Sequence, residues 1–316
     1  MEKNYFIGID LGGTKINGIL MDSRCNILSK YMIYTKASKG EKAVLNRIML
    51  VIDNLINYSK KNIKDIKCIG IGAPGPLNRK TGIILNTPNL PFKNFNIIET
   101  IKKIYNIPVV LDNDANVAVL GEYIFGSGKG YKNLIYITVS TGVGAGAIIN
   151  GKIYRGSTSN ALEIGHMTIM PKGPKCNCGN YGCLEALASG TSMEKLANKL
   201  VKKKHINTSL KKYNNITTYE IFNEAKNGDI ISNEIIDSAL EFLGIGISNI
   251  ITIFNPEAVI IGGGITNIGD RLFDIVKREV KKRCFENLYN NCSIIPSKLG
   301  KDSGAIGAAT LALMES

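Results

Sequence analysis

The sequence lacks two features that would direct it into or across a membrane. It has no long uninterrupted apolar run, since its most apolar stretch, residues 240–254, contains Ser248 and Asn249 and is too short to span a bilayer. Its first residues lack the basic region and apolar region of a secretory leader. We therefore expect a cytoplasmic protein without a membrane partner.

Acidic residues are also scarce relative to basic ones. There are 26 Asp and Glu residues against 39 Lys and Arg residues, which gives a formal net charge of +13. Such a surface favours anionic partners such as nucleotides or nucleic acid. The densest lysines lie at residues 202–212, beside His205, where we expect a solvated helix face and loop.

The cysteine content does not indicate a disulfide framework. Seven cysteines is an odd number, and a chain of 316 residues is large enough to fold without cross-links. Clustered cysteines are then expected to bind metal in a reducing compartment. Outside the cluster described below, Cys68 lies in an apolar run and is expected to be buried, and no role follows for Cys25, Cys284 and Cys292.

Length and composition predict two folded domains. An apolar fraction of 44%, with 21% charged residues and 33 glycines, excludes disorder, collagen and coiled coil. Strands are expected at residues 5–10, 16–21 and 27–34, and the sequence of strand, Gly/Thr turn and strand returns at residues 134–150. We expect an α/β domain at 1–115 and a larger one at 116–301, each opening with a β-meander, with a helix at 302–316 packing back on the first.

Each predicted domain has a glycine turn suited to phosphate. Asp10-Leu-Gly-Gly-Thr-Lys15 lies between two strands, so it is neither a dinucleotide fingerprint nor a Walker loop. Its backbone N–H groups can still bind an anion, and Asp10 can hold Mg²⁺. One such turn could be an ordinary hairpin, but two at matching positions predict nucleotide binding. The residues concerned are Asp10, Gly12, Gly13, Thr14 and Lys15 in the first turn and Thr141, Gly142 and Gly144 in the second.

Asp114 is a candidate general base. It follows the predicted strand 108–111 and opens a helix, where a carboxylate can take a proton from a hydroxyl that attacks phosphorus. The alternative is that Asp114 only caps its helix.

One histidine and three cysteines form the most specific pattern in the chain. His166, Cys176, Cys178 and Cys183 fall within eighteen residues, among glycines, and match a closed four-ligand zinc site. Such a site is structural, and it would fix the loop that carries Glu163 and Glu185.

Together these motifs resemble the ROK family, which contains bacterial sugar kinases and sugar-responsive repressors. The first glycine turn, Gly70-Ile-Gly-Ala-Pro-Gly75, Asn113-Asp114-Ala-Asn116 with Gly121-Glu122, and the second glycine turn are similar to successive family motifs. Gly262-Gly263-Gly264 resembles the adenosine motif, and Glu163 with the His/Cys cluster resembles the sugar and zinc motif.

The resemblance implies an actin/hexokinase-like (ribonuclease-H-like) ATPase fold with the active site in the interdomain cleft. It implies a Mg²⁺- and ATP-dependent hexose kinase acting at the 6-hydroxyl, with Asp114 as base, Gly262 and Gly263 at the nucleotide, and a structural Zn²⁺. The residues that would hold the sugar are Asn89, Asn113, Asp114, Glu163, His166 and Glu185. Members of the family commonly form homodimers.

One segment departs from the family pattern. Glucokinases of the family often have a glycine-rich run before the Glu163 motif, where this chain has Gly156-Ser-Thr-Ser-Asn-Ala-Leu162. Ser159 and Leu162 add bulk there and resemble some N-acylhexosamine kinases, whereas the length of the chain resembles the longer glucokinases. Glucose is the first expectation, with N-acetylmannosamine or N-acetylglucosamine as alternatives.

A sugar-sensing repressor is the competing class. It would carry a helix-turn-helix module before the first phosphate motif. Only nine residues precede Asp10, and they already form a predicted strand, so we expect no nucleic-acid partner.

Overall fold

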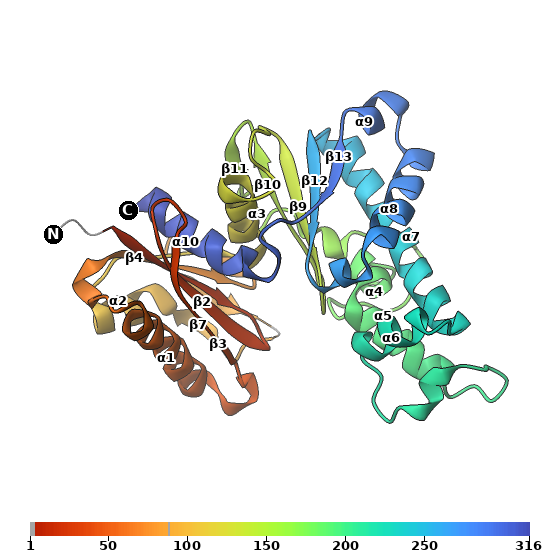
Figure 1. The fold of residues 1–316 in the computed structure, drawn as a ribbon, viewed down its shortest axis with the longest axis horizontal. Coiled ribbons are helices and arrows are strands. Elements are labelled where there is room, and N and C mark those ends of the chain that lie inside the picture. Colours follow the sequence, from red (N-terminus) through yellow and green to blue (C-terminus); the bar gives the residue numbers. More distant parts are fainter. Residues whose placement is uncertain (1–3, 88) are drawn as a thin grey trace. The chain divides into compact units, whose positions relative to one another are not determined.

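The computed structural model describes residues 4–87 and 89–316 (Figure 1). Its contacts divide the chain into two compact units. The first comprises the residues up to Tyr136, Gly146–Leu162 and Ser297–Ser316, and the second comprises Ile137–Ala145 and Glu163–Pro296. The chain thus leaves the first unit twice and returns to it twice.

The first unit is built on a five-stranded sheet of order β3-β2-β1-β4-β8. β1 (Tyr5–Leu11), β2 (Lys15–Asp22) and β3 (Ile27–Tyr34) form the expected antiparallel meander. β4 (Ile66–Ala73) and β8 (Val109–Asn113) continue the sheet in parallel with β1. β1 and β4 are mostly apolar and buried, Asp10 and Lys67 excepted, because both faces of these strands are covered.

Helices cover both faces of this sheet. α1 (Glu41–Ser59) buries a stripe of apolar residues at helical spacing, Val44, Ile48, Val51, Ile52 and Leu55. α10 (Ser303–Glu315) packs against another group of buried side chains that includes Phe6, Ile19 and Cys68. α10 lies so close to the sheet that a Cβ on Gly8 would come within 2.0 Å of the Ala305 carbonyl oxygen, so only glycine fits there.

A small antiparallel sheet was not expected from the sequence. It contains β5 (Leu77–Asn78), β6 (Ile83–Asn86) and β7 (Lys93–Asn96) and leads into α2 (Ile97–Tyr105). α3 (Asp114–Phe125) follows β8 directly.

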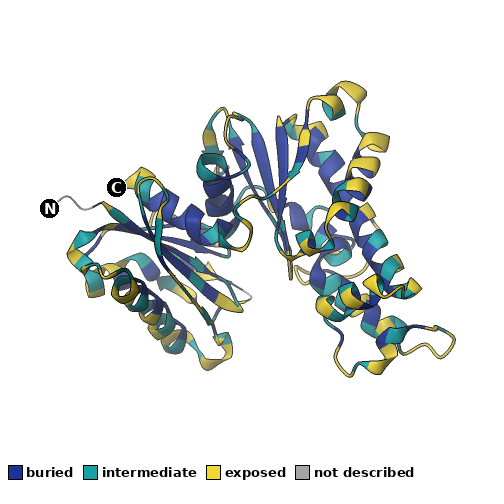
Figure 2. Cartoon of the chain, in the orientation of Figure 1, coloured by how far each residue is buried: buried dark blue, intermediate teal, exposed yellow. Residues whose placement is uncertain are grey.

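The second five-stranded sheet repeats the order of the first, as β11-β10-β9-β12-β13. Its strands are β9 (Leu134–Val139), β10 (Val143–Ile149), β11 (Lys152–Tyr154), β12 (Ala258–Gly262) and β13 (Ser293–Pro296). Its buried strands are dark blue in Figure 2. The predicted repeat of residues 5–21 at 134–150 is therefore matched by two sheets of equal topology.

The division of the chain differs from a boundary at residue 115. α3 stays with the first unit because it packs against α10 and against β10, where a Cβ on Gly146 would lie 2.5 Å from the Ala115 carbonyl oxygen. β9 and β10 each pass from one unit to the other, so no single position in the sequence separates the units.

The remaining helices belong to the second unit. They are α4 (Leu184–Ala188), α5 (Gly190–Leu200), α6 (Thr218–Lys226), α7 (Ile230–Phe254), α8 (Asp270–Arg283) and α9 (Glu286–Asn290). Among the described residues, α7 alone is long and apolar enough to cross a membrane, and most of its apolar window is buried inside the protein. A buried core helix has the same composition.

Candidate functional site

The first glycine turn joins β1 to β2 and is held by hydrogen bonds from two sides. The Gly12 N–H donates to the Lys15 carbonyl oxygen (3.0 Å), and the Thr35 hydroxyl donates to the Gly12 carbonyl oxygen (2.6 Å). Thr14 and Lys15 are exposed, and the Lys15 ammonium lies over the Tyr34 ring. The turn is therefore fixed while its hydroxyl and charge remain accessible.

Asn89 lies against this turn. A Cβ on Gly13 would come within 2.7 Å of the Asn89 Cβ, so only a glycine lets the two segments approach this closely. The structure thus brings a predicted sugar-binding residue next to a predicted phosphate-binding residue in the first unit.

Two carboxylates lie near each other at the ends of β1 and β8. Burial raises the pKa of Asp10 to about 7, and the negative charge of Asp114 contributes to that rise. Burial also raises the pKa of Asp114, against the lowering effect of a hydrogen bond from the Ala115 N–H (2.8 Å). The N-terminus of α10 adjoins the pair, since a Cβ on Gly304 would lie 2.6 Å from the Asp10 carboxylate. This pair is suited to a cation or a proton.

Asn113, rather than Asp114, caps the helix that follows. The Asn113 side chain accepts hydrogen bonds from the N–H groups of Ala115 (2.9 Å) and Asn116 (3.4 Å). Asp114 is the first residue of α3, and one of its oxygens accepts a hydrogen bond from the N–H of the next residue, Ala115. The simple capping role therefore belongs to Asn113.

The second glycine turn, residues 140–142, joins β9 to β10. The Glu185 carboxylate accepts a hydrogen bond from the Val143 N–H (3.0 Å) and lies where a Cβ on Gly142 would clash with it, at 2.5 Å. Gly144 is the second residue of β10. Glu185 thus fixes the second glycine turn at its junction with β10.

The predicted adenosine motif adjoins the same turn. Gly262 ends β12, and Gly263 follows at φ 87°, where a Cβ would come within 2.4 Å of the Val139 carbonyl oxygen. The Gly264 N–H donates to the Ser140 hydroxyl (3.0 Å). Thr141 and Gly264 line one cavity of about 570 Å³, together with Tyr219, Phe222, Ile265 and Lys226. The apolar walls of this cavity suit a nucleotide's adenine ring, and its single lysine suits a phosphate group.

Glu163 and His166 flank a short turn that packs on β10. Glu163 precedes the 3₁₀ turn Ile164–His166, and its carbonyl oxygen accepts from the His166 N–H (3.0 Å). A Cβ on Gly165 would lie 2.2 Å from the Val143 carbonyl oxygen. The second unit therefore anchors its three predicted sugar-binding residues to the second glycine turn and to β10. These residues are Glu163, His166 and Glu185.

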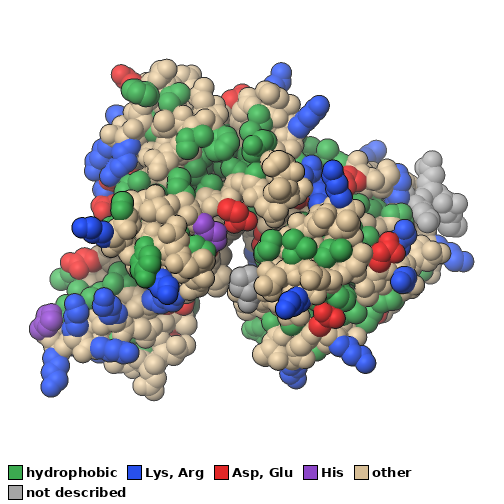
Figure 3. Space-filling model, turned by 180° about the vertical axis from the view of Figure 1, so that it is seen from behind, with side chains coloured by type: hydrophobic (Ala, Val, Ile, Leu, Met, Phe, Trp, Pro, Cys, Tyr) green, Lys and Arg blue, Asp and Glu red, His purple; other side chains and the backbone are tan. Residues whose placement is uncertain are grey.

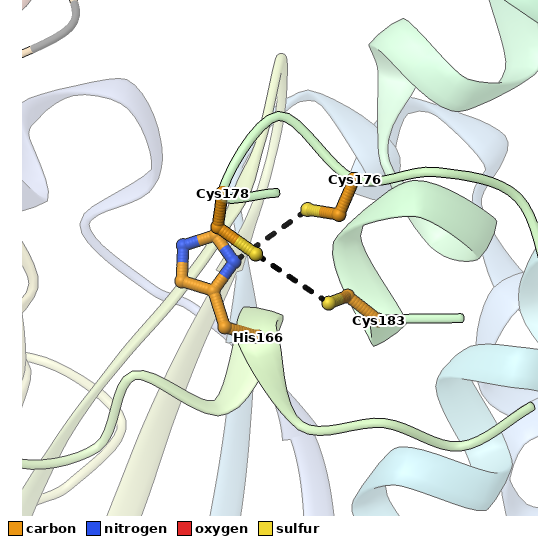
Figure 4. Close-up of side chains that lie close together, drawn as sticks. All are labelled: His166, Cys176, Cys178 and Cys183. Atoms are coloured by element: carbon orange, nitrogen blue, oxygen red, sulfur yellow. Dashed lines mark hydrogen bonds between the residues drawn. The ribbon is translucent and has the colours of Figure 1, made fainter. Parts of the chain in front are cut away.

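His166, Cys176, Cys178 and Cys183 converge on one point (Figure 4). Their ligand atoms all lie within 4.8 Å of one another, with the Cys178 and Cys183 Sγ atoms 3.7 Å apart and His166 Nδ1 3.7 Å from Cys176 Sγ. A tetrahedron with Zn–S bonds of about 2.3 Å has S···S edges of about 3.8 Å. The four residues can therefore hold one tetrahedral metal ion, with His166 using Nδ1 and leaving Nε2 to face elsewhere.

A second cavity, of about 360 Å³, adjoins the metal cluster. Thr141, Cys176, Glu185 and Phe242 are among its lining residues. Glu185 therefore lies between this cavity and the second glycine turn.

The basic charge is not gathered into one continuous area on the face shown in Figure 3. His205 and the lysines at positions 202–204, 211 and 212 are exposed, as expected for a solvated segment.

The residue that the sequence analysis overlooked is Asp112, two positions before the candidate base. Its side chain is fully buried and contacts Arg155 and Arg79. Only its proximity to Asp114 in the sequence could have drawn attention to it.

Two five-stranded sheets of equal topology, each with a glycine turn between its first two strands, define a two-domain α/β fold of the actin/hexokinase-like class. Residues 6–315 match the model of the ROK family, and the chain belongs to that family.

Its relatives include both enzymes and regulators. A glucokinase from Halalkalibacterium halodurans is 33% identical over 98% of this chain and 96% of its own length. A xylose repressor from Bacillus subtilis is 33% identical over 99% of this chain and 78% of its own length. The crystal structure of a ROK family glucokinase from Streptomyces griseus, in complex with glucose and AMPPNP, has a TM-score of 0.86 at 29% identity and covers 98% of this chain and 99% of its own. These relatives support a sugar kinase.

Proposed function

We propose that this protein is an ATP- and Mg²⁺-dependent hexose kinase that transfers the γ-phosphate to the 6-hydroxyl of glucose. The observation that carries the proposal is the half-buried pair of interacting carboxylates, Asp10 and Asp114, beside the first glycine turn. The likeness to a glucokinase complexed with glucose and AMPPNP supports the same reaction and the same class of phosphate donor.

Asp114 acts as the general base. Its raised pKa makes the carboxylate a better proton acceptor than an ordinary Asp. It takes the proton of the sugar 6-hydroxyl as that oxygen bonds to the γ-phosphorus and the bond to ADP breaks. Asn113 is then left to fix the start of α3 and to bind a sugar hydroxyl.

The other site residues hold the two substrates. Gly12, Gly13, Thr14 and Lys15 bind phosphate in one unit, and Thr141, Gly142 and Gly144 bind it in the other. Gly262 and Gly263 lead directly into Gly264, which lines the cavity proposed for adenosine. Asn89, Glu163, His166 and Glu185 hold the sugar hydroxyls, His166 through Nε2.

Two metal ions fit the donor sets. Asp10 would hold Mg²⁺, which neutralises charge on the transferred phosphate and prefers a carboxylate with phosphate oxygens. The cluster of His166 and three cysteines would hold a structural Zn²⁺. We further propose a cytoplasmic homodimer without nucleic-acid or membrane partners.

The test is ADP release by the purified protein with Mg²⁺ and ATP. Glucose, mannose, fructose, N-acetylglucosamine and N-acetylmannosamine are compared, with Asp114→Asn as the blank. We expect turnover with glucose and a fall in kcat of at least about a hundredfold in the variant, without loss of sugar binding. Preference for an acetamido sugar would reassign the substrate, and a variant with near wild-type turnover would remove Asp114 as base.

A sugar-sensing role is the second candidate, because a xylose repressor is 33% identical to this chain along nearly its whole length. The presence of the base and of both phosphate turns favours the kinase. Sugar binding without ADP release, by a folded protein, would support the sensing role instead.

A further inference from the structure

Asp112 is a fully buried carboxylate near the end of β8, the strand that leads to the proposed base Asp114. One of its oxygens accepts hydrogen bonds from the Asn113 N–H (2.8 Å) and from the Asn116 side-chain amide (3.0 Å). The other accepts from Arg155 Nε (2.7 Å) and faces Arg79 Nε at 3.4 Å. A buried charge persists only with such partners, so the side chain has a single arrangement available to it.

The two arginines extend this contact into a closed ring. The Arg79 guanidinium also pairs with Glu315, and Arg155 approaches Glu315 at 3.7 Å. Asp112, Arg155, Glu315 and Arg79 thus alternate in charge and sum to zero. The arginine side chains are about a quarter exposed, whereas Asp112 is not exposed at all.

Arg155 also closes the loop that departs from the family's glycine-rich pattern. Its carbonyl oxygen accepts a hydrogen bond from the Ala161 N–H (3.2 Å), which joins the two ends of the loop 156–161. Gly156, at φ 68°, packs against Ala161, where its absent Cβ would lie 2.9 Å from the Ala161 Cβ. Arg155 therefore holds two segments at once. Its backbone carbonyl oxygen closes the loop 156–161, and its side chain binds Asp112 near the end of β8.

We propose that Arg155 is a positioning residue that fixes the loop 156–161 relative to Asn113 and Asp114, so that the loop's fit to the sugar governs turnover. The proposal rests on the proposed kinase function. Asp112 transmits the position of Arg155, because the same carboxylate binds Arg155 and the Asn113 N–H. Arginine is suited to this role since its planar fork binds carboxylates in a fixed orientation, which lysine cannot reproduce.

The experiment compares Arg155→Lys and Arg155→Gln with the wild-type protein. Arg271→Gln is the matched control, because Arg271 pairs with Asp237 (2.6 Å) on helices of the second unit and contacts none of the proposed site residues in the described part of the chain. Steady-state kinetics are measured with glucose and with N-acetylglucosamine, and for ATP.

We expect both Arg155 variants to lower kcat with the preferred sugar by about tenfold or more, since small misplacements of reacting groups are costly. The ratio of kcat/KM between the two sugars should move toward one, while KM for ATP and the control variant stay near wild-type values. A uniform loss on both sugars, or recovery of the sugar ratio by lysine, would overturn the positioning role.

A second readout does not depend on activity. Hydrogen exchange should become faster in both the loop 156–161 and residues 113–116 when Arg155 is replaced, because both segments lose the same anchor. Unchanged exchange at 113–116 would refute the link even if the loop itself loosened. If the wild-type protein released no ADP on any sugar, the kinase proposal would fail, and this exchange test of the link would still stand.

Discussion

At the scale of single residues, the pair of Asp10 and Asp114 sets how the metal-free protein responds to pH. The folded-state pKa of Asp10 is about 7, against 3.8 for an ordinary Asp. Between these values the folded protein retains a proton that the unfolded chain has released. The contribution of Asp10 to the free energy of unfolding therefore falls as the pH rises from about 4 to about 7.

Asp10→Asn removes this dependence, because an amide has no proton to lose. We expect the variant to be more stable than the metal-free wild-type protein at pH 8, and the difference to shrink as the pH falls toward 4. Thermal melts across this range measure it, with Asp274→Asn, an exposed carboxylate of α8, as the control. Equal pH profiles for wild type and Asp10→Asn would contradict the assignment.

Leu162 holds an unusual backbone conformation directly before Glu163. Its φ is 66° and that of Ser159 is 64°, both in the left-handed region that favours glycine. The two positions that the sequence analysis identified as departing from a glycine-rich pattern are thus the two that keep the backbone of glycine.

The free energy of unfolding of Leu162→Gly should exceed that of Leu162→Ala by about 1 kcal/mol. Both variants lose the leucine side chain, and only glycine adopts this φ without strain. Leu196, in the middle of α5, is the matched control, since there alanine should be the more stable of the two. Chemical denaturation of the four variants measures both differences. The same order at both positions would rule out strain at Leu162.

At the scale of elements, we expect the fold of the segment 166–183 to depend on the proposed metal ion. Its described backbone belongs to no named strand and is held by turn hydrogen bonds and by two isolated β-bridges, between Thr168 and Cys183 and between Lys175 and Tyr181. A four-ligand zinc site contributes on the order of 10 kcal/mol of binding free energy, which becomes folding free energy for such a segment.

Cys178→Ser should therefore lose zinc and lower the melting temperature together, whereas Cys25→Ser should retain one zinc per chain. Metal analysis alongside thermal melts tests this. An unchanged melting temperature in a zinc-free variant would exclude a structural role for the metal.

How far the sequence predicts these elements depends on how local their signals are. β1 and β9 alternate or run apolar between glycine turns, so the repeat of the two sheets could be predicted. β5 to β7 could not, because residues such as Asn78, Asn86 and Lys93 give no apolar alternation. The glycine turns and the metal ligands lie close together in the sequence and could be found.

The contacts of Asp112 lay beyond sequence reasoning. Its partners Arg79 and Arg155 lie 76 positions apart, and Glu315, which pairs with both arginines, lies 160 positions beyond Arg155. Only the folded chain brings them together. The same holds for Glu185, whose hydrogen bond from the Val143 N–H, just after the second glycine turn, spans 42 positions.

At the scale of the whole molecule, Glu122 anchors the segment by which the chain returns from the second unit. Its buried carboxylate accepts hydrogen bonds from the N–H groups of Ser127 (2.8 Å) and Leu299 (2.9 Å) and from the hydroxyls of Ser297 and Ser303. All four of these groups donate to the Glu122 carboxylate, so both of its oxygens must act as acceptors.

Glu122→Gln replaces one of these oxygens with an amide NH₂ group, which would face other hydrogen-bond donors. We expect it to lower the free energy of unfolding by about 2–3 kcal/mol. Glu241→Gln on α7, where the ion pair with Arg278 is half-exposed, should change it by less than about 1 kcal/mol. Urea denaturation compares the two variants, and equal effects would show that the carboxylate of Glu122 is not required.

The return of α10 to the first sheet has a consequence for how the protein is made. Phe6, Ile19 and Cys68 are covered by Ala305, Ile306 and Ala309, which the ribosome adds some 240 residues after Cys68. Throughout the synthesis of the intervening residues, the sheet that is translated first has one apolar face without its helix. The first unit to be translated is therefore the last to be completed.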